Sequence, residues 1–274
     1  MSSQKQHTVW LWTEGVFARR IIYFLLMKKL APKVSSILNG CSISPTLTIV
    51  PVQPGPALSW QPVNAGDPTP PKHASNPCLR ITDLATKEER HIYESTSILL
   101  YLEELYPEHP LQPRELVDRA KMMDFLGQIN LVAIDTNYKL RNTIPEHGMA
   151  MGLMPESQRK ETAVNAEAQE KKGYEKLLSW AHEESFRTTG WLTPGMDTPG
   201  LVDIALAPNV RFVDLVYGIK TFDGEKLRGL QDWYEKFQSL EWWQDFEERD
   251  GILPGMLSFG KTSRAQWITG LSEH

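Results

Sequence analysis

Apolar positions in the first third of the chain recur with two different periods, which predicts alternating strands and helices. Residues 7–12 alternate as a short strand does, and residues 16–30 place apolar side chains at helical spacing. Residues 45–52 are apolar and β-branched and predict a second strand, parallel to the first because a helix intervenes. Residues 78–81 and 90–93 predict a hairpin around a charged turn, followed by a helix that reads ESTSILLYLEELYP.

The pattern changes after residue 106. Residues 107–113 read PEHPLQP and predict a linker, and everything beyond it has helical spacing. Long amphipathic helices are expected over residues 114 to about 141 and 157 to about 184, an apolar helix over 201–217, and two shorter helices within 227–248. The prediction is therefore an α/β domain over 1–106 and an all-α domain over 114–274. The tail 251–274, with Phe259 and Trp267, is expected either to fold back or to fray.

The segment from Pro51 to Pro77 interrupts the first domain. It contains eight prolines counting both ends, which is too many for a regular helix, and it is longer than most loops. Long loops in compact domains often carry function, so this segment is a candidate for the mouth of a substrate site.

Composition narrows the class of protein. The net charge of −5, with both signs interspersed over 274 residues, argues against a nucleic-acid partner, which would require a basic face. The sequence has no apolar run of membrane-spanning length and no secretory signal pattern near its first residues, so a cytoplasmic protein without a membrane partner is expected. Cys41 and Cys78 form neither a disulfide framework nor a CxxC pair.

Metal and nucleotide sites are not predicted. The seven histidines lack HxxxH or HExxH spacing, and no cysteine cluster accompanies them. The phosphate-binding patterns GxGxxG and GxxxxGK[ST] are absent from the sequence.

Two short features suggest a ligand site. The bond before Pro77 is the kind of peptide bond that readily becomes cis, and a cis turn would expose the backbone of Asn76. Glu94 and Ser95 stand where a helix begins, beside the unpaired N–H groups of its first turn. Such a corner suits a ligand that carries an amine and a carboxylate. Each feature alone is typical of an ordinary turn or helix cap.

Together, these features resemble the glutathione-binding half of the glutathione transferase family. The resemblance implies that Pro77 is the family's cis-proline, that the Asn76 backbone pairs with the cysteinyl main chain of glutathione, and that Glu94 and Ser95 hold its γ-glutamyl end. It also implies a thioredoxin-like domain followed by a helical-bundle domain, the glutathione transferase fold.

A second match lies downstream. Residues 191–194 and 200–208, WLTP and GLVDIALAP, are similar to the family's helix-six signature, in which a Ser or Thr cap is followed three residues later by Asp. Gly200 occupies the cap position and supplies no side-chain oxygen. Asp203 can still reach back to the cap N–H, so half of the capping box is expected.

The resemblance implies further roles for several basic residues. Lys72 and His73 precede Pro77 closely enough to reach the glycyl carboxylate of glutathione, although exposed basic loop residues are commonly only solvated surface. Arg19 and Arg20, near the first helical turn, could bind the same carboxylate or cap the domain interface.

The residue that would activate the thiol departs from the family pattern. Gly15 stands where the family has Ser or Cys, and Val16 where a proline is frequent. Thr13 is the nearest hydroxyl and is our candidate catalytic residue, with support from the helix dipole. A water-mediated contact and a substrate group that acts as base are the alternatives.

The implied function is a glutathione transferase that presents the thiolate to an apolar electrophile, an epoxide or an activated alkene, or that isomerises a double bond by reversible addition. The cleft is expected between residues of both domains: Trp12, Phe17, Met122, Phe125 and Tyr217. The sequence looks most like fungal members, some of which act in secondary metabolism, and the family commonly forms homodimers. The alternatives are a non-catalytic binding or regulatory relative and a carrier of apolar ligands.

Overall fold

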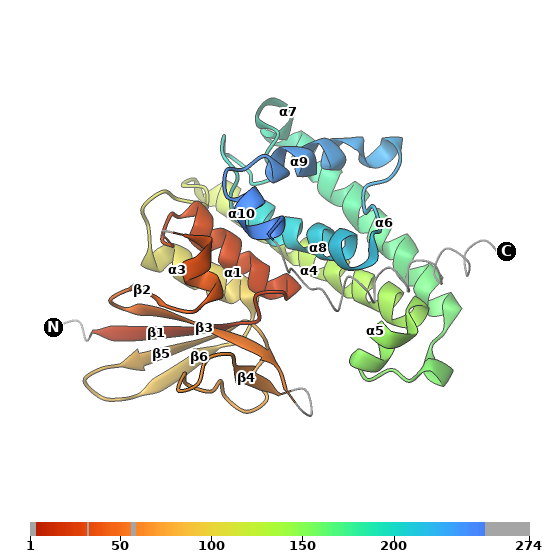
Figure 1. Cartoon of the computed structure of the whole chain (residues 1–274). Coiled ribbons are helices and arrows are strands. Elements are labelled where there is room, and N and C mark those ends of the chain that lie inside the picture. Colours follow the sequence, from red (N-terminus) through yellow and green to blue (C-terminus); the bar gives the residue numbers. More distant parts are fainter. Residues whose placement is uncertain (1–3, 32, 56–58, 250–274) are drawn as a thin grey trace. The chain divides into compact units, whose positions relative to one another are not determined.

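The computed structural model describes residues 4–31, 33–55 and 59–249 of the chain (Figure 1). The described chain divides into two compact units, one of residues 4–111 with 241–249 and one from Gln112 to Leu240. The division falls inside the predicted linker 107–113. Residues 241–249, which the sequence assigns to the all-α domain, instead cluster with the first unit. Phe259 and Trp267 lie outside the described residues.

The first unit alternates strands and helices, with three short additions that periodicity does not reveal, α2, β2 and β4. Its elements are β1 (Lys5–Leu11), α1 (Val16–Met27), α2 (Val34–Leu38), β2 (Ser42–Ser44), β3 (Leu47–Pro54), β4 (Trp60–Pro62), β5 (Cys78–Asp83), β6 (Glu89–Ile92), α3 (Ser95–Leu105) and α10 (Trp243–Glu247). The predicted strands and helices of residues 7–105 are therefore confirmed to within a few residues.

The sheet is mixed and has β1 near its centre. Five strands follow the order β2-β3-β1-β5-β6, and β4 pairs with β3 outside this path. β1 runs parallel to β3, as predicted, with Val9 opposite Ile49, and antiparallel to β5, with Val9 opposite Leu79. Because side chains alternate along a strand, these three residues share one face of the sheet. α1 and α3 lie side by side on that face (Figure 1).

The proline-rich segment covers the other face. Trp10, which alternates with Val9, donates a hydrogen bond from Nε1 to the Pro68 carbonyl at 2.7 Å. It belongs to an apolar cluster drawn from the sheet and this segment: Trp10, Val50, Val52, Ala74 and Cys78, with Trp12 and Trp60 at its edge. No helix forms in residues 55 and 59–77, the described part of this stretch. A proline-bearing loop with one short strand therefore covers this face instead of a helix.

α10 packs against α1 and explains why residues 241–249 cluster with the first unit. The Tyr23 ring lies 4.8 Å from the ring centre of Trp242 and 6.1 Å from that of Phe246. Arg19 and Glu247 form an ion pair at 2.9 Å between fully buried side chains. A buried ion pair inside an aromatic contact fixes α10 to one face of α1.

The second unit is all helical and contains both long helices that the sequence predicts. Its elements are α4 (Leu116–Thr143), α5 (Pro145–Ala150), η2 (Pro155–Ser157), α6 (Lys160–Glu183), α7 (Phe186–Thr189), α8 (Leu201–Tyr217), η3 (Glu225–Leu227) and α9 (Arg228–Gln238). α4 and α6 pack closely along their length. A Cβ on Gly173 would lie only 2.5 Å from the Val132 Cγ2, so α6 needs glycine where it crosses α4. None of the described helices is long and apolar enough to cross a membrane.

The start of α8 shows how the chain compensates for Gly200. The Gly200 N–H donates to the Asp203 Oδ2 at 2.9 Å, which confirms the predicted half of the capping box. The missing half comes from Thr193, whose Oγ1 accepts a hydrogen bond of 3.1 Å from the Val202 N–H. Thr193 is fully buried and lies seven residues before the cap. A side chain from the preceding segment therefore supplies the oxygen that Gly200 lacks.

Candidate functional site

The peptide bond between Asn76 and Pro77 is cis, as the sequence predicts. The Asn76 side chain ties this loop to the end of β1. Its Oδ1 accepts a hydrogen bond of 2.8 Å from the Trp12 N–H, and its Nδ2 donates to the Trp10 carbonyl at 3.5 Å. The side chain is thus engaged within the fold, and the backbone of Asn76 is the part of the residue that a ligand would pair with.

A second contact ties the same loop to the beginning of α3. The Ser75 hydroxyl donates to the carbonyl of Tyr93, the residue before Glu94, at 2.6 Å. Glu94 is the N-cap residue of α3 and is exposed, whereas Ser95 is the first helical residue and is 5% exposed. Within the described residues no side chain caps this helix. The structure therefore brings the two predicted halves of the site together within one unit.

The turn between β1 and α1 carries Thr13, the predicted catalytic residue. Thr13 is half-buried in this turn, and Gly15, the N-cap residue of α1, donates from its N–H to the Trp12 carbonyl at 2.8 Å. A Cβ on Gly15 would lie 2.9 Å from the Trp12 Cε3 and 3.2 Å from the Trp12 oxygen. The Trp12 ring therefore leaves no room for a serine or cysteine side chain at Gly15.

A network of charged residues holds this turn in place, and sequence reasoning missed it. The Arg249 Nη2 donates to the Glu14 Oε1 at 2.7 Å, and Arg19 donates to the Glu14 carbonyl from its Nη1. The Arg19 Nε and the Tyr23 hydroxyl both donate to the Glu247 Oε1, at 2.9 and 2.7 Å. Burial lowers the pKa of Arg19, but Glu247, Tyr23 and Glu14 together more than offset this, so that the pKa is raised. Nothing local in the sequence pairs residues more than 220 positions apart.

Lys72 and His73 are both exposed in the loop before Ser75. His73 has a positive φ of 65°, which turns the chain sharply just before the cis bond. Among the described residues, neither side chain forms a hydrogen bond or ion pair with α3 or with the turn after β1. A contact with a glycyl carboxylate stays a prediction for both residues.

The two cysteines do not provide a nucleophile at this site. Cys78 lies at the start of β5, is fully buried in the Trp10 cluster, and burial raises the pKa of its thiol to about 11. A buried thiol of that kind behaves as a small apolar side chain. Cys41 is a half-buried free cysteine between α2 and β2.

The predicted substrate residues occupy different environments in the two units. In the first unit, Phe17 is 43% exposed beside the Arg20 guanidinium, whereas the half-buried Trp12 ring packs 5.7 Å from the centre of Trp60. In the second unit, Met122 is buried and the buried Phe125 packs edge-on against Trp180. A substrate role for these residues stays a prediction.

Tyr217, the fifth predicted substrate residue, belongs to a buried polar pair of the second unit. Its hydroxyl shares a hydrogen bond of 2.6 Å with the His147 Nδ1. Burial raises the pKa of Tyr217 well above its usual range, and burial together with the charge of Arg141 lowers the pKa of His147 to about 4. Both side chains are therefore neutral at neutral pH, and this predicted substrate residue is part of the core of its unit.

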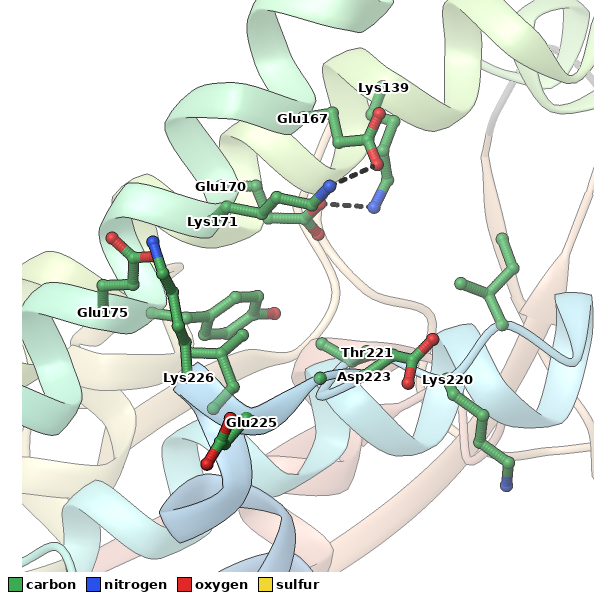
Figure 2. Close-up of a pocket in the computed structure, with 14 residues that line it drawn as sticks. Lys139, Glu167, Glu170, Lys171, Glu175, Lys220, Thr221, Asp223, Glu225 and Lys226 are labelled. Atoms are coloured by element: carbon green, nitrogen blue, oxygen red, sulfur yellow. Dashed lines mark hydrogen bonds and ion pairs between the residues drawn. The ribbon is translucent and has the colours of Figure 1, made fainter. Parts of the chain in front are cut away.

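The second unit also contains a hollow of about 460 Å³, formed by α4, α6 and the segment from Ile219 to Leu227 (Figure 2). Its lysines face carboxylates. Lys139 pairs with Glu170, and Lys171 lies 3.2 Å from Glu167, as the dashed lines in Figure 2 show. None of the predicted site residues lines this hollow. Its paired charges do not identify a ligand. Within the described residues no group of His, Cys, Asp or Glu side chains could hold a metal ion.

Comparisons with known proteins agree with this architecture. No known protein-family profile matches the chain. Glutathione S-transferase 1 of Dianthus caryophyllus is 28% identical over 157 residues, 54% of this chain, and the match spans only 61% of that relative's length.

Two solved structures share the fold at low sequence identity. A theta class glutathione S-transferase from Xanthomonas axonopodis pv. citri has a TM-score of 0.54 and 15% identity, over 89% of this chain and 97% of that one. Maleylacetoacetate isomerase from Anaeromyxobacter dehalogenans 2CP-1, solved with bound GSH, has a TM-score of 0.55 and 19% identity, over 92% of this chain and all of that one. The chain resembles the glutathione S-transferase superfamily and has its fold, a thioredoxin-like domain followed by an all-α domain.

Proposed function

We propose that this chain binds glutathione where the cis-proline loop meets the start of α3, and that it presents the glutathione thiolate to an apolar electrophile. The observation that carries the proposal is the hydrogen bond of 2.6 Å from the Ser75 hydroxyl to the Tyr93 carbonyl, which holds the loop of Asn76 beside the start of α3. The solved isomerase with bound GSH shares this fold. In this arrangement the Asn76 backbone pairs with the cysteinyl unit, and Glu94 and Ser95 hold the γ-glutamyl end.

The thiol requires a donor because free thiols are largely protonated at neutral pH. Since Trp12 fills the space beside Gly15, the candidates are the Thr13 hydroxyl and the N–H groups at the start of α1. A helix N-terminus carries partial positive charge and stabilises an anion near it. Thr13 would donate a hydrogen bond to the sulfur, and α1 would add the favourable potential.

Replacing Thr13 by valine is expected to lower kcat/KM for conjugation roughly tenfold to hundredfold, the range for loss of one hydrogen bond to a charged group. The pKa seen in the pH profile of kcat/KM should rise, because the thiolate loses its donor. The profile is measured on wild type, on Thr13→Val and on a control, Thr48→Val, in β3. An unchanged profile in Thr13→Val would assign thiol activation to α1 or to water.

We propose that the electrophile is an apolar epoxide or activated alkene bound near Trp12 and Phe17 of the first unit, and that the protein acts in fungal secondary metabolism. Conjugation forms a C–S bond and consumes glutathione, whereas isomerisation adds the thiolate, lets the C–C bond rotate and then eliminates glutathione unchanged. Measuring thiol consumption together with double-bond geometry distinguishes conjugation from isomerisation.

Because the reaction needs reduced glutathione, which the cytosol maintains, we propose a cytoplasmic location.

A second candidate function is binding or regulation without catalysis. The observation that favours it is the Trp12 ring, which takes the place of the usual thiol-activating side chain at Gly15. This candidate predicts glutathione binding without consumption of any epoxide or alkene and without isomerisation. Turnover that Thr13→Val reduces would rule it out.

We also propose that the protein forms a homodimer through α4. One face of α4 exposes apolar side chains at helical spacing: Met123, Leu131, Ile134 and Tyr138. An exposed apolar stripe on a helix is typical of an interaction surface, and a two-fold axis would bring the same stripe of a second copy against it.

Replacing Leu131 by glutamate is expected to weaken dimerisation at least tenfold, because each interface would then bury two like charges. Analytical ultracentrifugation over a concentration series measures the effect. Lys172→Glu, on the exposed side of α6, changes charge away from the stripe and serves as the control. A wild-type chain that stays monomeric at high concentration would contradict the dimer.

A further inference from the structure

A buried arginine lies behind the first turn of α3. Arg20 belongs to α1 and is 1% exposed. Its Nη1 donates to the Ser95 Oγ at 3.2 Å and to the Thr96 Oγ1 at 3.4 Å. The sequence offers Arg20 as a partner of the glycyl carboxylate or as a cap of the domain interface. The structure instead places it at the γ-glutamyl end of the proposed site.

This contact determines where the Ser95 hydroxyl hydrogen can point. A serine hydroxyl has one donor hydrogen and two acceptor lone pairs, and arginine only donates. Arg20 therefore occupies the acceptor side of Ser95, and the hydrogen must point elsewhere. Within the described residues Arg20 is the one hydrogen-bond partner of this hydroxyl. The hydrogen thus remains available to an oxygen of a ligand.

The guanidinium also changes the strength of that donor. Burial lowers the pKa of Arg20 to about 10, with Glu94 opposing the shift, so Arg20 stays positive at neutral pH. A cation on the acceptor side polarises the O–H bond, and hydrogen bonds in such chains strengthen one another. The polarised hydroxyl is matched to an anionic acceptor, for which charge-assisted bonds are about twice as strong as neutral ones.

The charges around Ser95 complement the head group of an α-amino acid. Glu94 is exposed and negative, and it lies close enough to Arg20 to raise the pKa of the guanidinium. A ligand ammonium would face Glu94, and the neighbouring α-carboxylate would face the Ser95 hydroxyl and the N–H groups of the first turn. Because Arg20 is buried, it acts on the ligand through Ser95 rather than by contact.

We propose that Arg20 is a positioning residue that makes this site select a free α-amino-acid head, by fixing and polarising the Ser95 hydroxyl for the α-carboxylate. The proposal rests on the proposed binding of glutathione and adds the chemical basis of its selectivity. The polarised Ser95 hydroxyl would distinguish glutathione from thiols that carry the same cysteinylglycine but lack the α-carboxylate.

The test uses three ligands and isothermal calorimetry on the full chain. They are glutathione, γ-aminobutyryl-cysteinylglycine, which lacks only the α-carboxylate, and glutaryl-cysteinylglycine, which lacks only the amine. Wild type is expected to prefer glutathione to the carboxylate-free analogue roughly tenfold to hundredfold, the range for one hydrogen bond to a charged group. In Arg20→Met this preference should fall about tenfold, while the preference over the amine-free analogue is retained.

Arg80→Met is the control, because it removes an arginine of the same unit that pairs with Glu89 rather than with Ser95. It should retain the carboxylate preference within about twofold. Ser95→Ala should lose the preference, and adding Arg20→Met to it should cause little further loss, as expected for two residues that act as one unit. If the role of Arg20 were purely structural, Arg20→Met would weaken the binding of all three ligands alike.

Two further experiments test the proposal even if Arg20→Met does not fold. Arg20→Gln removes the charge and keeps a donor, and it should also lose most of the preference. In wild type, the side-chain ¹H–¹⁵N signal of Arg20 should shift with glutathione and remain in place with the carboxylate-free analogue. The proposal would be overturned if Arg20→Met or Arg20→Gln kept the preference for glutathione over the carboxylate-free analogue. It would also be overturned if the Arg20 signal responded equally to both ligands. Either result would leave glutathione binding intact. No glutathione binding by wild type would remove both.

Discussion

Replacing Glu247 by alanine is expected to lower the free energy of unfolding by about 3–5 kcal/mol, the cost of leaving one partner of a buried ion pair alone. Its carboxylate accepts hydrogen bonds from the Arg19 Nε and the Tyr23 hydroxyl, and the side chains of both charged partners are fully buried. Without Glu247, the buried guanidinium of Arg19 keeps its contacts with Glu14 but loses its fully buried counter-ion. Urea unfolding followed by circular dichroism measures the change.

The matched control is Glu241→Ala. Glu241 precedes α10 and pairs with Lys29 at 3.9 Å, but both of these side chains are more than 70% exposed, so the loss should be barely measurable. The Glu247 variant should also bind glutathione more weakly, because Arg19 and Arg249 hold the turn that carries Thr13. A Glu247→Ala protein as stable as its control would show that α10 contributes little to the first unit.

Replacing Asp203 by asparagine is expected to cost at least about 3 kcal/mol, although the two side chains have nearly the same shape. The carboxylate accepts five hydrogen bonds inside the protein, from Leu192 N, Thr193 N, Thr193 Oγ1, Gly200 N and Trp233 Nε1. Asparagine keeps one acceptor oxygen and points an NH₂ group at the remaining donors. Each buried donor left without an acceptor costs about 1–3 kcal/mol.

The control for this change is Asp197→Asn, at an exposed position of the same segment, which should leave stability unchanged. Thermal and urea unfolding of both variants, compared with wild type, measure the effect. The loss at Asp203 should appear in the second unit, since all five donors lie within it. A loss below about 1 kcal/mol would mean that the neighbouring backbone adjusts easily, contrary to the rigid α8 start described above.

Local signals predicted most of the first unit. The alternation of residues 7–12 and the spacing of 16–30 correspond to β1 and α1, and the X-Pro step at Pro77 is cis. Each of these features depends on a few consecutive residues, so periodicity and proline chemistry are enough to find it. The helix start at Glu94 and Ser95 is predicted for the same reason, and α3 does begin at Ser95.

The features that sequence reasoning missed depend on residues far apart in the chain. Arg249 reaches Glu14, and Glu247 reaches Arg19, across more than 220 positions. The Thr193 hydroxyl caps α8 from outside the usual capping pattern. The contact between Arg20 and Ser95 spans 75 positions. No periodicity connects such pairs, and a charged residue in an amphipathic helix is usually expected to face solvent.

The segment that covers one face of the sheet was only partly predicted from the sequence. The many prolines of the segment before Asn76 excluded a helix, which the structure bears out within the described residues. The sequence did not show what this segment forms, because an irregular loop has no repeating pattern. The replacement depends on single contacts, such as the hydrogen bond from Trp10 to the Pro68 carbonyl.

Glutathione binding is the central claim, and calorimetric titration of the wild-type chain with glutathione tests it most directly, with Glu94→Ala/Ser95→Ala as the comparison. The account predicts one glutathione per chain, with micromolar to millimolar affinity in wild type and at least about tenfold weaker binding in the double variant, since two charge-assisted contacts are lost. No binding by wild type, or equal binding by both proteins, would contradict it.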